Sequence, residues 1–338
     1  MKNLFLVCTS DYYYKNKIFD VDSPTNRDNY YYPYYLLRKK FYESGVLLNT
    51  YDYFDKNKEK EYGLVFFDIP RNIENYLNDD SHENYLVIWE SSVVYPINWK
   101  IELHKHFKKI FTWNDKVVDK NKYIKFYWPD KIPENLDFNL TKKNKICAMI
   151  IGHKFKSHPL ELYTERVKAI RWFEHNHPED FDLYGMGWDT YCFNGALSAL
   201  NRFTFLTKHI RPNYPSYKGT VEKKRDVYER YKFSICYENA RDIPGYITEK
   251  IFDCFFAGCV PIYWGAPNVT DFIPEDTFID KRKFNSYEEL YNYIKNMTDE
   301  EYLGYLAAIK NFIKSPKIYP FSAECFTDTI ISEILKND

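Results

Sequence analysis

The chain has 338 residues, of which 45% are apolar and 28% are charged. This length suffices for two domains of ordinary size, and the composition is that of a globular protein. The 47 basic and 48 acidic residues leave a formal net charge of −1, which gives no case for nucleic acid as a partner.

The cysteines and the hydropathy of the sequence indicate in which compartment of the cell we expect the protein. The seven cysteines are scattered, contain no C-x-x-C pair and lie in part within apolar runs, so we expect small buried residues in a reducing compartment, without zinc or a disulfide framework. The apolar run at residues 4–8 is too short for a signal peptide, and no run approaches the roughly 20 apolar residues of a membrane span. We therefore expect a cytoplasmic protein; peripheral membrane contact and the oligomeric state stay open.

The first half of the chain alternates short apolar runs with helical stretches. The pattern predicts a helix over residues 30–43, a helical step at 104–107, and strands at 3–8, 64–68, 85–89 and 110–113. Polar loops follow each strand, which is typical of an α/β domain.

The alternation restarts after proline-rich and polar segments at residues 129–133 and 139–145, which suit a linker. Strands are predicted at 146–151, 181–184, 233–237 and 260–264, and helices at 161–175, 287–297, 301–312 and 323–335. We therefore predict two Rossmann-like α/β domains facing across a cleft, the first at 1–140 and the second at 145–315, and a C-terminal helical segment at 316–338 that packs back on the first domain.

Residues 231–280 contain the most informative stretch. The apolar run 233–237 suits a strand buried on both faces, and the polar segment 239–245 follows it. Thr248 is a candidate helix cap, and Gly258 stands where a left-handed residue ends many helices. Between them, apolar residues recur on one helix face at Ile251, Phe252, Phe255 and Phe256.

A strand–helix–strand unit of this kind predicts where a ligand binds. Parallel strands present their carboxyl ends to a crevice, and the next helix points its free N–H groups into it. Lys250 at that helix start suits a diphosphate, and Glu249 beside it suits hydroxyl groups or developing positive charge. A nucleotide sugar combines both features. Neither G-x-x-x-x-G-K-[ST] nor G-x-G-x-x-G occurs in the chain.

Three motifs in this stretch carry a family resemblance. Tyr237-Glu238-Asn239, the segment YITEKI at 246–251 and the segment GCVPIYWGAP at 258–267 resemble the signature of the α-1,3/1,4-fucosyltransferases. The resemblance is strong over about fifty residues and fainter over about a hundred more. It implies the two-domain GT-B fold, an inverting and metal-independent transfer from GDP-fucose, and similarity to the soluble bacterial or viral form.

The resemblance also points to a general base in the first half. Glu90 directly follows the predicted strand 85–89, and Trp89-Glu90-Ser91 resembles the segment that holds the proposed base of the family. Relatives commonly continue with Ser-Pro, whereas this chain has Ser91-Ser92. Without the donor motif downstream, a glutamate after a strand is usually a solvated loop residue. With that motif we predict Glu90 as the catalytic base.

Cations for the departing diphosphate are predicted at two positions. Lys250 is one, and Arg166 is the other because it precedes the strand 181–184 much as a diphosphate-binding arginine does in the family. Arg171 on the same predicted helix is its rival, and either arginine could be an ordinary surface charge. Glu249 resembles the family carboxylate near the fucose ring; alternatively it is a first-turn acid that favours the helix dipole.

Three further motif residues have expected roles. Asn239 and Tyr246 match positions that contact the nucleotide sugar in relatives, and Glu238 is expected to hold the loop in shape. Relatives usually have serine where this chain has Ala240, so one hydroxyl of the site is missing.

No metal or other cofactor is predicted. Two Asp-x-Asp sequences occur, at 20–22 and 180–182, but the first lies in a polar loop and the second enters a strand. His104 with His106, and His175 with His177, lack supporting ligands and are expected to be surface histidines.

These features lead to one hypothesis and two alternatives. The hypothesis is an inverting fucosyltransferase that moves L-fucose from GDP-β-L-fucose to an N-acetyllactosamine-type oligosaccharide, at O3 or alternatively O4 of N-acetylglucosamine. The alternatives are a transferase of the same fold that uses another GDP-hexose, and a catalytically silent glycan- or nucleotide-binding relative. Aromatic residues of the first half, such as those at 30–35, Trp89, Tyr95, Trp99 and Trp128, are candidates for stacking on acceptor sugars.

Overall fold

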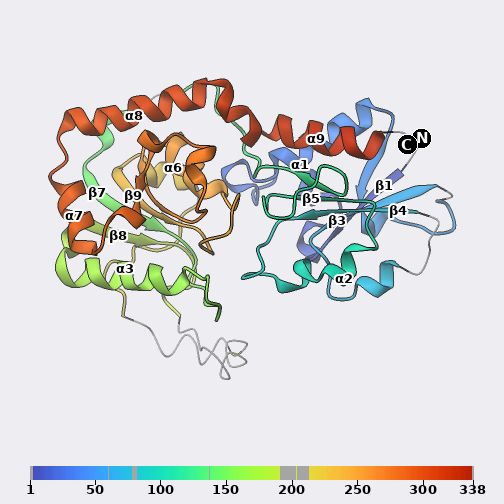
Figure 1. Ribbon diagram of the computed structural model, residues 1–338, viewed down its shortest axis with the longest axis horizontal. Helices are drawn as coiled ribbons and strands as arrows, with labels where there is room; N and C mark the ends of the chain where they lie inside the picture. The colour runs from blue at the N-terminus through green and yellow to red at the C-terminus, as the bar shows by residue number, and fades with distance from the viewer. Residues whose placement is uncertain are drawn as a thin grey trace. The chain divides into compact units, whose positions relative to one another are not determined.

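The structure is a computed structural model that describes residues 3–59, 61–77, 82–136, 138–190, 203 and 213–336. The chain divides into two compact units (Figure 1). Unit 1 comprises residues 1–132, 244–246 and 318–338, and unit 2 comprises residues 133–243 and 247–317. The first boundary falls at Ile132, inside the segment that the sequence suggested as a linker.

Unit 1 is built on a six-stranded parallel sheet with the strand order β2-β1-β3-β4-β5-β6. Its central strands are fully or almost fully buried because both faces of a parallel sheet are covered by other elements. The strands are β1 (Asn3–Cys8), β2 (Leu47–Thr50), β3 (Tyr62–Phe67), β4 (Glu83–Ile88), β5 (Lys109–Thr112) and β6 (Tyr123–Lys125).

The helices of unit 1 cover this sheet. In Figure 1, α1 (Tyr32–Glu43) and α9 (Ala323–Leu335) lie on one face of the sheet and the short α2 (Ile101–His104) on the other. Helix α9 comes from the end of the chain, packs along α1, and joins it through an ion pair of 2.6 Å between Lys40 and Asp328. The C-terminal helix is therefore a part of unit 1.

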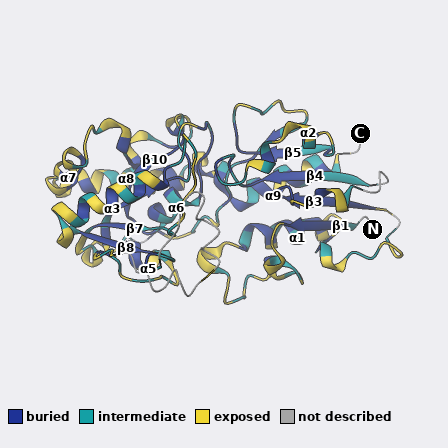
Figure 2. Ribbon diagram, turned by 90° about the horizontal axis from the view of Figure 1, so that it is seen from below, coloured by how far each residue is buried: buried dark blue, intermediate teal, exposed yellow. Residues whose placement is uncertain are grey.

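Unit 2 contains a five-stranded parallel sheet with the order β11-β10-β9-β7-β8. In Figure 2 its strands β7 and β8 are dark blue, whereas helix α7 carries exposed residues. The strands are β7 (Lys145–Ile150), β8 (Phe181–Tyr184), β9 (Tyr231–Tyr237), β10 (Val260–Trp264) and β11 (Ile279–Asp280). The helices are α3 (Tyr163–Asn176), α5 (Lys224–Tyr228), α6 (Glu249–Phe256), α7 (Tyr287–Lys295) and α8 (Asp299–Lys314).

The α/β fold with two parallel sheets is confirmed. The predicted bounds agree with β1, β8, β10 and α9 to the residue, and Gly258 has the expected positive φ of 61° after α6. The strands β2, β6 and β11 were not predicted; they have two to four residues and lie at sheet edges, where their sequences carry little apolar pattern. Among the helices of the described ranges, none has the length and apolarity needed to cross a membrane.

Two expectations about single residue types can be compared with the structure. Cys8, Cys147, Cys236, Cys254 and Cys259 are buried free thiols, as predicted, whereas Cys192 lies outside the described residues. The prediction of surface histidines is wrong for His104, which is 2% exposed. Its two ring nitrogens lie 2.9 Å from the Tyr123 hydroxyl and 2.7 Å from the carbonyl oxygen of Asn98. His104 is therefore a buried residue whose two ring nitrogens are both hydrogen-bonded.

Candidate functional site

In unit 2, the carboxyl ends of the neighbouring strands β7 and β9 are each followed by a helix that carries a candidate cation. Arg166 lies in the first turn of α3, after β7, and Lys250 is the second residue of α6, after β9. Both side chains line the same small pocket, together with Ile151 and Tyr237. Its volume of about 10 Å³ corresponds to one water-sized group. It therefore marks the point where two cations converge, not a whole nucleotide site.

The loops that follow β7 and β9 are bonded to each other, which sets the position of Arg166. The Leu162 amide donates to the Asn239 carbonyl at 3.1 Å, and Glu161 and Ala240 form an antiparallel bridge. The Arg166 guanidinium, in a residue that is 3% exposed, donates to the Tyr237 carbonyl at 2.7 Å and to Oδ1 of Asn239 at 3.0 Å. Backbone pairing and these two bonds together fix a buried guanidinium at the end of β9.

Arg171, the rival on the same helix, lies elsewhere. It is exposed, donates to Glu174 at 2.7 Å and to the Asn213 carbonyl at 2.6 Å, and stacks over the Tyr214 ring. Arg171 does not line the pocket that holds Arg166 and Lys250. The structure thus separates the two arginines that the sequence left as alternatives.

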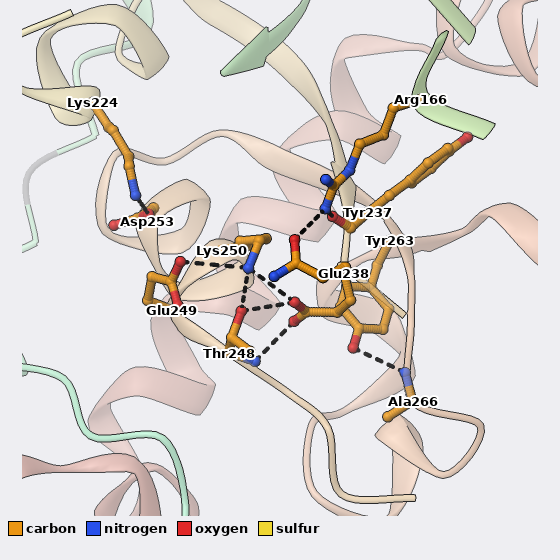
Figure 3. Close-up of polar contacts among 11 residues, drawn as sticks. Arg166, Lys224, Tyr237, Glu238, Thr248, Glu249, Lys250, Asp253, Tyr263 and Ala266 are labelled. Carbon is orange, nitrogen blue, oxygen red and sulfur yellow. Dashed lines mark hydrogen bonds and ion pairs between the residues drawn. The ribbon is translucent and has the colours of Figure 1, made fainter. Parts of the chain in front are cut away.

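Glu238 organises the start of α6 (Figure 3). Its fully buried carboxylate accepts hydrogen bonds from the Thr248 amide at 2.8 Å and from the Thr248 hydroxyl at 2.7 Å, and lies 3.1 Å from the amino group of Lys250. Thr248 does occupy the cap position of α6, but the expectation that its side chain caps the helix is wrong. The Thr248 hydroxyl instead donates its hydrogen bond to Glu238, and the same oxygen accepts a hydrogen bond from the Lys250 amino group at 2.8 Å.

The charge on Lys250 is stabilised by its neighbours. Burial opposes the charged form, but the carboxylates of Glu238 and Glu249 outweigh this effect and raise the pKa of Lys250 above its ordinary value. Burial would also raise the pKa of Glu249, and the adjacent Lys250 lowers it instead, below its usual range. Lys250 is therefore a cation, and Glu249 an anion, at neutral pH. Figure 3 shows the Lys250 amino group pointing between Glu249, Thr248 and Glu238.

Gly265 makes room for Glu238. A Cβ atom at this position would lie 2.4 Å from the Tyr263 hydroxyl and 2.5 Å from Cγ of Glu238. The same Tyr263 hydroxyl accepts a bond from the Ala266 amide at 3.2 Å. A side chain larger than hydrogen would therefore push Glu238 away from Thr248 and Lys250.

In unit 1, Glu90 follows β4 and lines a pocket of about 290 Å³. Aromatic rings make up much of the wall, and Asp68, at the end of the neighbouring strand β3, also lines it. The aromatic members are Tyr13, Tyr30, Tyr34, Phe67, Trp89, Tyr95 and Trp128. A carboxylate beside aromatic rings is a combination suited to a polar ligand with apolar faces, such as a sugar.

Hydrogen bonds to the Asp68 carboxylate fix the backbone of the turn that contains Glu90. Oδ1 of Asp68 accepts bonds from the amides of Trp89 at 2.7 Å and Glu90 at 3.2 Å, and from Nδ2 of Asn98 at 2.6 Å. The Trp99 indole donates to the Glu90 carbonyl at 3.1 Å. Asp68 has a φ of 60°, a left-handed conformation that aspartate tolerates better than most residues. Burial raises its pKa to about 6.

Sequence reasoning did not select Asp68. The signal was available, because Asp68 follows β3 just as Glu90 follows β4, and the carboxyl ends of adjacent parallel strands meet at one sheet edge. The sequence could not show that the Asp68 carboxylate accepts hydrogen bonds from the turn that follows the neighbouring strand β4.

Tyr246 and the remaining candidates take other positions. Tyr246 is 1% exposed and belongs to unit 1, where its ring packs against Trp113 with centroids 4.5 Å apart.

The two aspartates of the second Asp-x-Asp sequence are bonded to protein groups. Asp180 accepts hydrogen bonds from Lys295 and the Tyr291 hydroxyl, and Asp182 accepts them from Lys145 and the Tyr231 hydroxyl. Throughout the described residues, no group of three or more His, Cys, Asp and Glu side chains could hold a metal ion.

Comparison with known proteins assigns the chain to a family. Residues 140–318 match the C-terminal region of glycosyltransferase family 10, the fucosyltransferases. This is slightly more than half of the chain, and it contains Arg166, Glu238, Glu249 and Lys250. The chain belongs to this family.

Its relatives include several fucosyltransferases. The chain is 42% identical over 76 residues to an α-(1,3)-fucosyltransferase of Helicobacter pylori, a match covering 22% of this chain and 16% of the relative. It is 46% identical over 70 residues to an α-(1,4)-fucosyltransferase of Arabidopsis thaliana, covering 21% of this chain and 17% of the relative. The chain thus matches about a sixth of the length of these curated relatives.

The fold is shared with solved glycosyltransferase structures. A crystal structure of an α1,3-fucosyltransferase with GDP-fucose has a TM-score of 0.52 at 15% identity, covering 100% of this chain and 92% of the other. The chain therefore has the GT-B fold of family 10. Glu90 and Asp68 lie outside the residues matched to the family, so their assignment depends on the geometry of unit 1.

Proposed function

We propose that this family member is an inverting fucosyltransferase that transfers L-fucose from GDP-β-L-fucose to a hydroxyl of an N-acetylglucosamine-containing glycan. The observation that carries the proposal is the convergence of Arg166 and Lys250 at the ends of β7 and β9, within the residues that match the family. A buried and a half-buried cation at helix starts suit a diphosphate, and the name of the similar structure supplies GDP-fucose as the donor.

Each residue has a defined task in the proposed reaction. Glu90 takes the proton of the acceptor hydroxyl, whose oxygen forms a bond to the anomeric carbon of fucose. The bond from that carbon to the GDP oxygen breaks with its electron pair, and the new linkage has the opposite, α configuration. Arg166 and Lys250 stabilise the negative charge that develops on GDP, and the Glu249 carboxylate stabilises positive charge on the sugar ring.

The basic residues would do the work that a metal ion does in other sugar transferases. Arg166 and Lys250 line one small pocket, while the Asp180 and Asp182 carboxylates are bonded to lysine and tyrosine side chains. We therefore propose that transfer needs no divalent cation, and activity in excess EDTA should equal activity with Mg²⁺ or Mn²⁺ added.

A transfer assay tests the proposal. The protein is incubated with GDP-fucose or GDP-mannose and with N-acetylglucosamine or N-acetyllactosamine, and products are identified by mass spectrometry and NMR. We expect an α-fucosyl product at O3, with O4 as the alternative, from GDP-fucose alone. The variant Glu90→Gln should lose transfer by roughly 10²-fold or more because the base is removed. GDP binding should be unchanged in that variant.

The outcomes separate the alternatives. Transfer from GDP-mannose at an equal rate would favour another GDP-hexose as the donor. GDP binding without transfer to any acceptor would favour a silent relative. Normal turnover by Glu90→Gln would remove Glu90 from the mechanism but leave the donor assignment intact.

A further inference from the structure

Helix α1 and the edge strand β2 of unit 1 line a pocket that the proposed reaction does not use. Its volume of about 420 Å³ is of the size of pockets that bind small molecules. It shares no lining residue with the pocket of Glu90. Four of its residues recur at helical spacing on α1, namely Tyr35, Arg38, Lys39 and Tyr42. We call it the α1–β2 pocket.

Most of the wall of the α1–β2 pocket is apolar or aromatic. Phe19 and Leu48 are buried members of this wall. Tyr35, Tyr42 and Leu47 are 38%, 65% and 36% exposed. Large side chains that stay exposed around one pocket bury apolar surface when a ligand covers them. The wall therefore favours a ligand with an apolar ring or short chain.

The charge of this wall is positive. Arg38 and Lys39 are its charged residues, and no acidic residue occurs in the part of the wall that the structure describes. The Lys39 amino group lies 3.9 Å from the Glu43 carboxylate, and both side chains are more than half exposed. An exposed pair of this kind contributes little to stability and leaves the lysine available to a ligand. The pocket therefore favours an anionic group over a neutral or cationic one.

The position of the Arg38 guanidinium is restrained by the neighbouring segments. Its Nη2 atom donates to Oδ1 of Asn49 in β2 at 2.9 Å, and the guanidinium lies 5.0 Å from the centre of the Phe19 ring. The same Asn49 oxygen accepts a bond from Nδ2 of Asn16 at 3.1 Å, and Oδ1 of Asn16 accepts one from the Thr50 amide at 2.9 Å. These bonds join the segment of Asn16 and Phe19 to β2, so the cation is held before a ligand arrives.

The Arg38 guanidinium has donors left for a further partner. It carries five N–H donors, and Asn49 is its only hydrogen-bond acceptor among the described residues. No carboxylate in the described part of the chain forms an ion pair with Arg38, and burial lowers its pKa. A carboxylate or phosphate would supply the missing negative partner, since the guanidinium fork matches either group.

We infer that the α1–β2 pocket binds a small amphiphilic anion, in which a carboxylate or phosphate is joined to an apolar ring or short chain. The anionic group bonds to Arg38 and Lys39, and the apolar part packs against Tyr35, Tyr42 and Leu48. A neutral sugar would leave the two cations without a negative partner, and free phosphate would leave the apolar wall uncovered. This site goes beyond the proposed function, because it uses none of the residues assigned to fucosyl transfer.

Isothermal titration with matched probes tests the site. The wild-type protein is titrated with 4-phenylbutyrate and with phenyl phosphate, and we expect saturable binding of each. Two further probes lack one feature each: 4-phenylbutanamide has the apolar part without the charge, and inorganic phosphate has the charge without the apolar part. Both should bind at least about 10-fold more weakly than their counterparts. No saturable binding of either organic anion, or equal binding of a probe that lacks one feature, would overturn the inference.

Substitutions locate the bound anion. Arg38→Met should weaken 4-phenylbutyrate binding about 10-fold, and Tyr42→Ser should weaken it about 3- to 10-fold through the lost ring contact. Lys39→Met should weaken it about 3-fold. Lys39 and Tyr42 are exposed, so their variants keep the test valid if Arg38→Met does not fold. The matched control is Arg27→Met, which removes an exposed arginine of unit 1 that does not line the pocket and should bind as wild type does.

Two results would place the anion elsewhere. Binding that is weakened by Arg166→Met but not by Arg38→Met would assign it to the cations of unit 2 and overturn the inference. An anionic lipid presents the same chemistry from a bilayer, so cosedimentation with phosphatidylglycerol vesicles is measured as well. Vesicle binding that Arg38→Met abolishes, without binding of either free anion, would overturn the inference in favour of a membrane surface. None of these measurements needs fucosyl transfer, so the proposed function and this site fail independently.

Discussion

The amino group of Lys250 lies 3.1 Å from the carboxylate of Glu238, and Glu238 is completely buried. The carboxylate comes from the end of strand β9 and the lysine from the first turn of α6, with Thr248 bonded to both (Figure 3). A buried carboxylate thus positions the cation that the proposed reaction uses and keeps it charged.

The coupling of this pair can be measured. In Glu238→Gln, the fully buried carboxylate partner of the half-buried Lys250 is removed, so the free energy of unfolding should fall by about 3 kcal/mol. In the double variant Glu238→Gln/Lys250→Met, neither member of the pair carries a charge, and the loss should be smaller than the sum of the two single losses. Urea denaturation of all four proteins gives the coupling free energy. Strict additivity would show that the two residues do not act as a pair.

Removing Lys250 should affect turnover. Lys250→Ala takes away one group that we propose stabilises the departing GDP, and kcat should fall by roughly 10²–10³-fold. Lys168→Ala is the matched control, because Lys168 is an exposed cation on α3 that pairs with Glu165. It should retain full activity. Near-normal turnover by Lys250→Ala would remove this lysine from the mechanism.

The two arginines of α3 should behave differently. Arg166→Met should weaken GDP binding by roughly 10- to 100-fold, since it removes a buried guanidinium that lines the pocket. Arg171→Met should leave GDP binding unchanged, because Arg171 bonds to Glu174 at the surface. Isothermal titration with GDP measures both. Arg166→Lys, which keeps the charge but not the forked geometry, should give an intermediate affinity. If Arg171→Met weakened binding as strongly as Arg166→Met, the assignment would be wrong.

Asp68 should make stability depend on pH. Burial raises its pKa from 3.8 to about 6, so the folded state holds this proton more tightly than the unfolded state does. The resulting stabilisation is fully present below about pH 4 and is lost as the pH rises through 6. Asp68→Asn removes this dependence while retaining an oxygen for the Trp89 and Glu90 amides.

Relative to wild type, Asp68→Asn should therefore gain about 2.5 kcal/mol in unfolding free energy between pH 4 and pH 7. Chemical denaturation at both pH values gives this difference directly. Asp68→Ala, which removes the acceptor itself, should in addition reduce fucosyl transfer by releasing the turn that carries Glu90. A relative gain at the lower pH would contradict the raised pKa.

A pair of glycine substitutions should have opposite effects. Gly265→Ala places a methyl group within 2.5 Å of Glu238 Cγ, so it should lower the melting temperature and weaken GDP binding at least about 10-fold. Gly304→Ala introduces the same methyl group inside helix α8, where nothing lies within 4 Å of it. There it should raise stability by about 0.5–1 kcal/mol. Thermal unfolding with and without GDP tests both variants, and a tolerant Gly265→Ala would show that Glu238 need not stay in place.

Local sequence pattern was sufficient to predict every described strand of the two sheets except β2, β6 and β11. The runs that became β1, β8 and β10 are short, apolar and bounded by polar turns, and buried parallel strands need this pattern. The edge strand β2 was missed because one side of an edge strand is open, so its residues need not be apolar. His104 was misplaced because a histidine outside an apolar run gives no sign of the two partners that bury it.

The sequence by itself determined the type of fold, the strand–helix–strand unit around Lys250 and the family resemblance, because these depend on residues close together in the chain. Only the tertiary structure decided that Arg166 rather than Arg171 reaches the pocket, that Glu238 binds Lys250, and that Asp68 supports the turn of Glu90. These relationships join residues on different strands and helices. Their geometry follows from how the strands pair and how the helices pack, which no local pattern specifies.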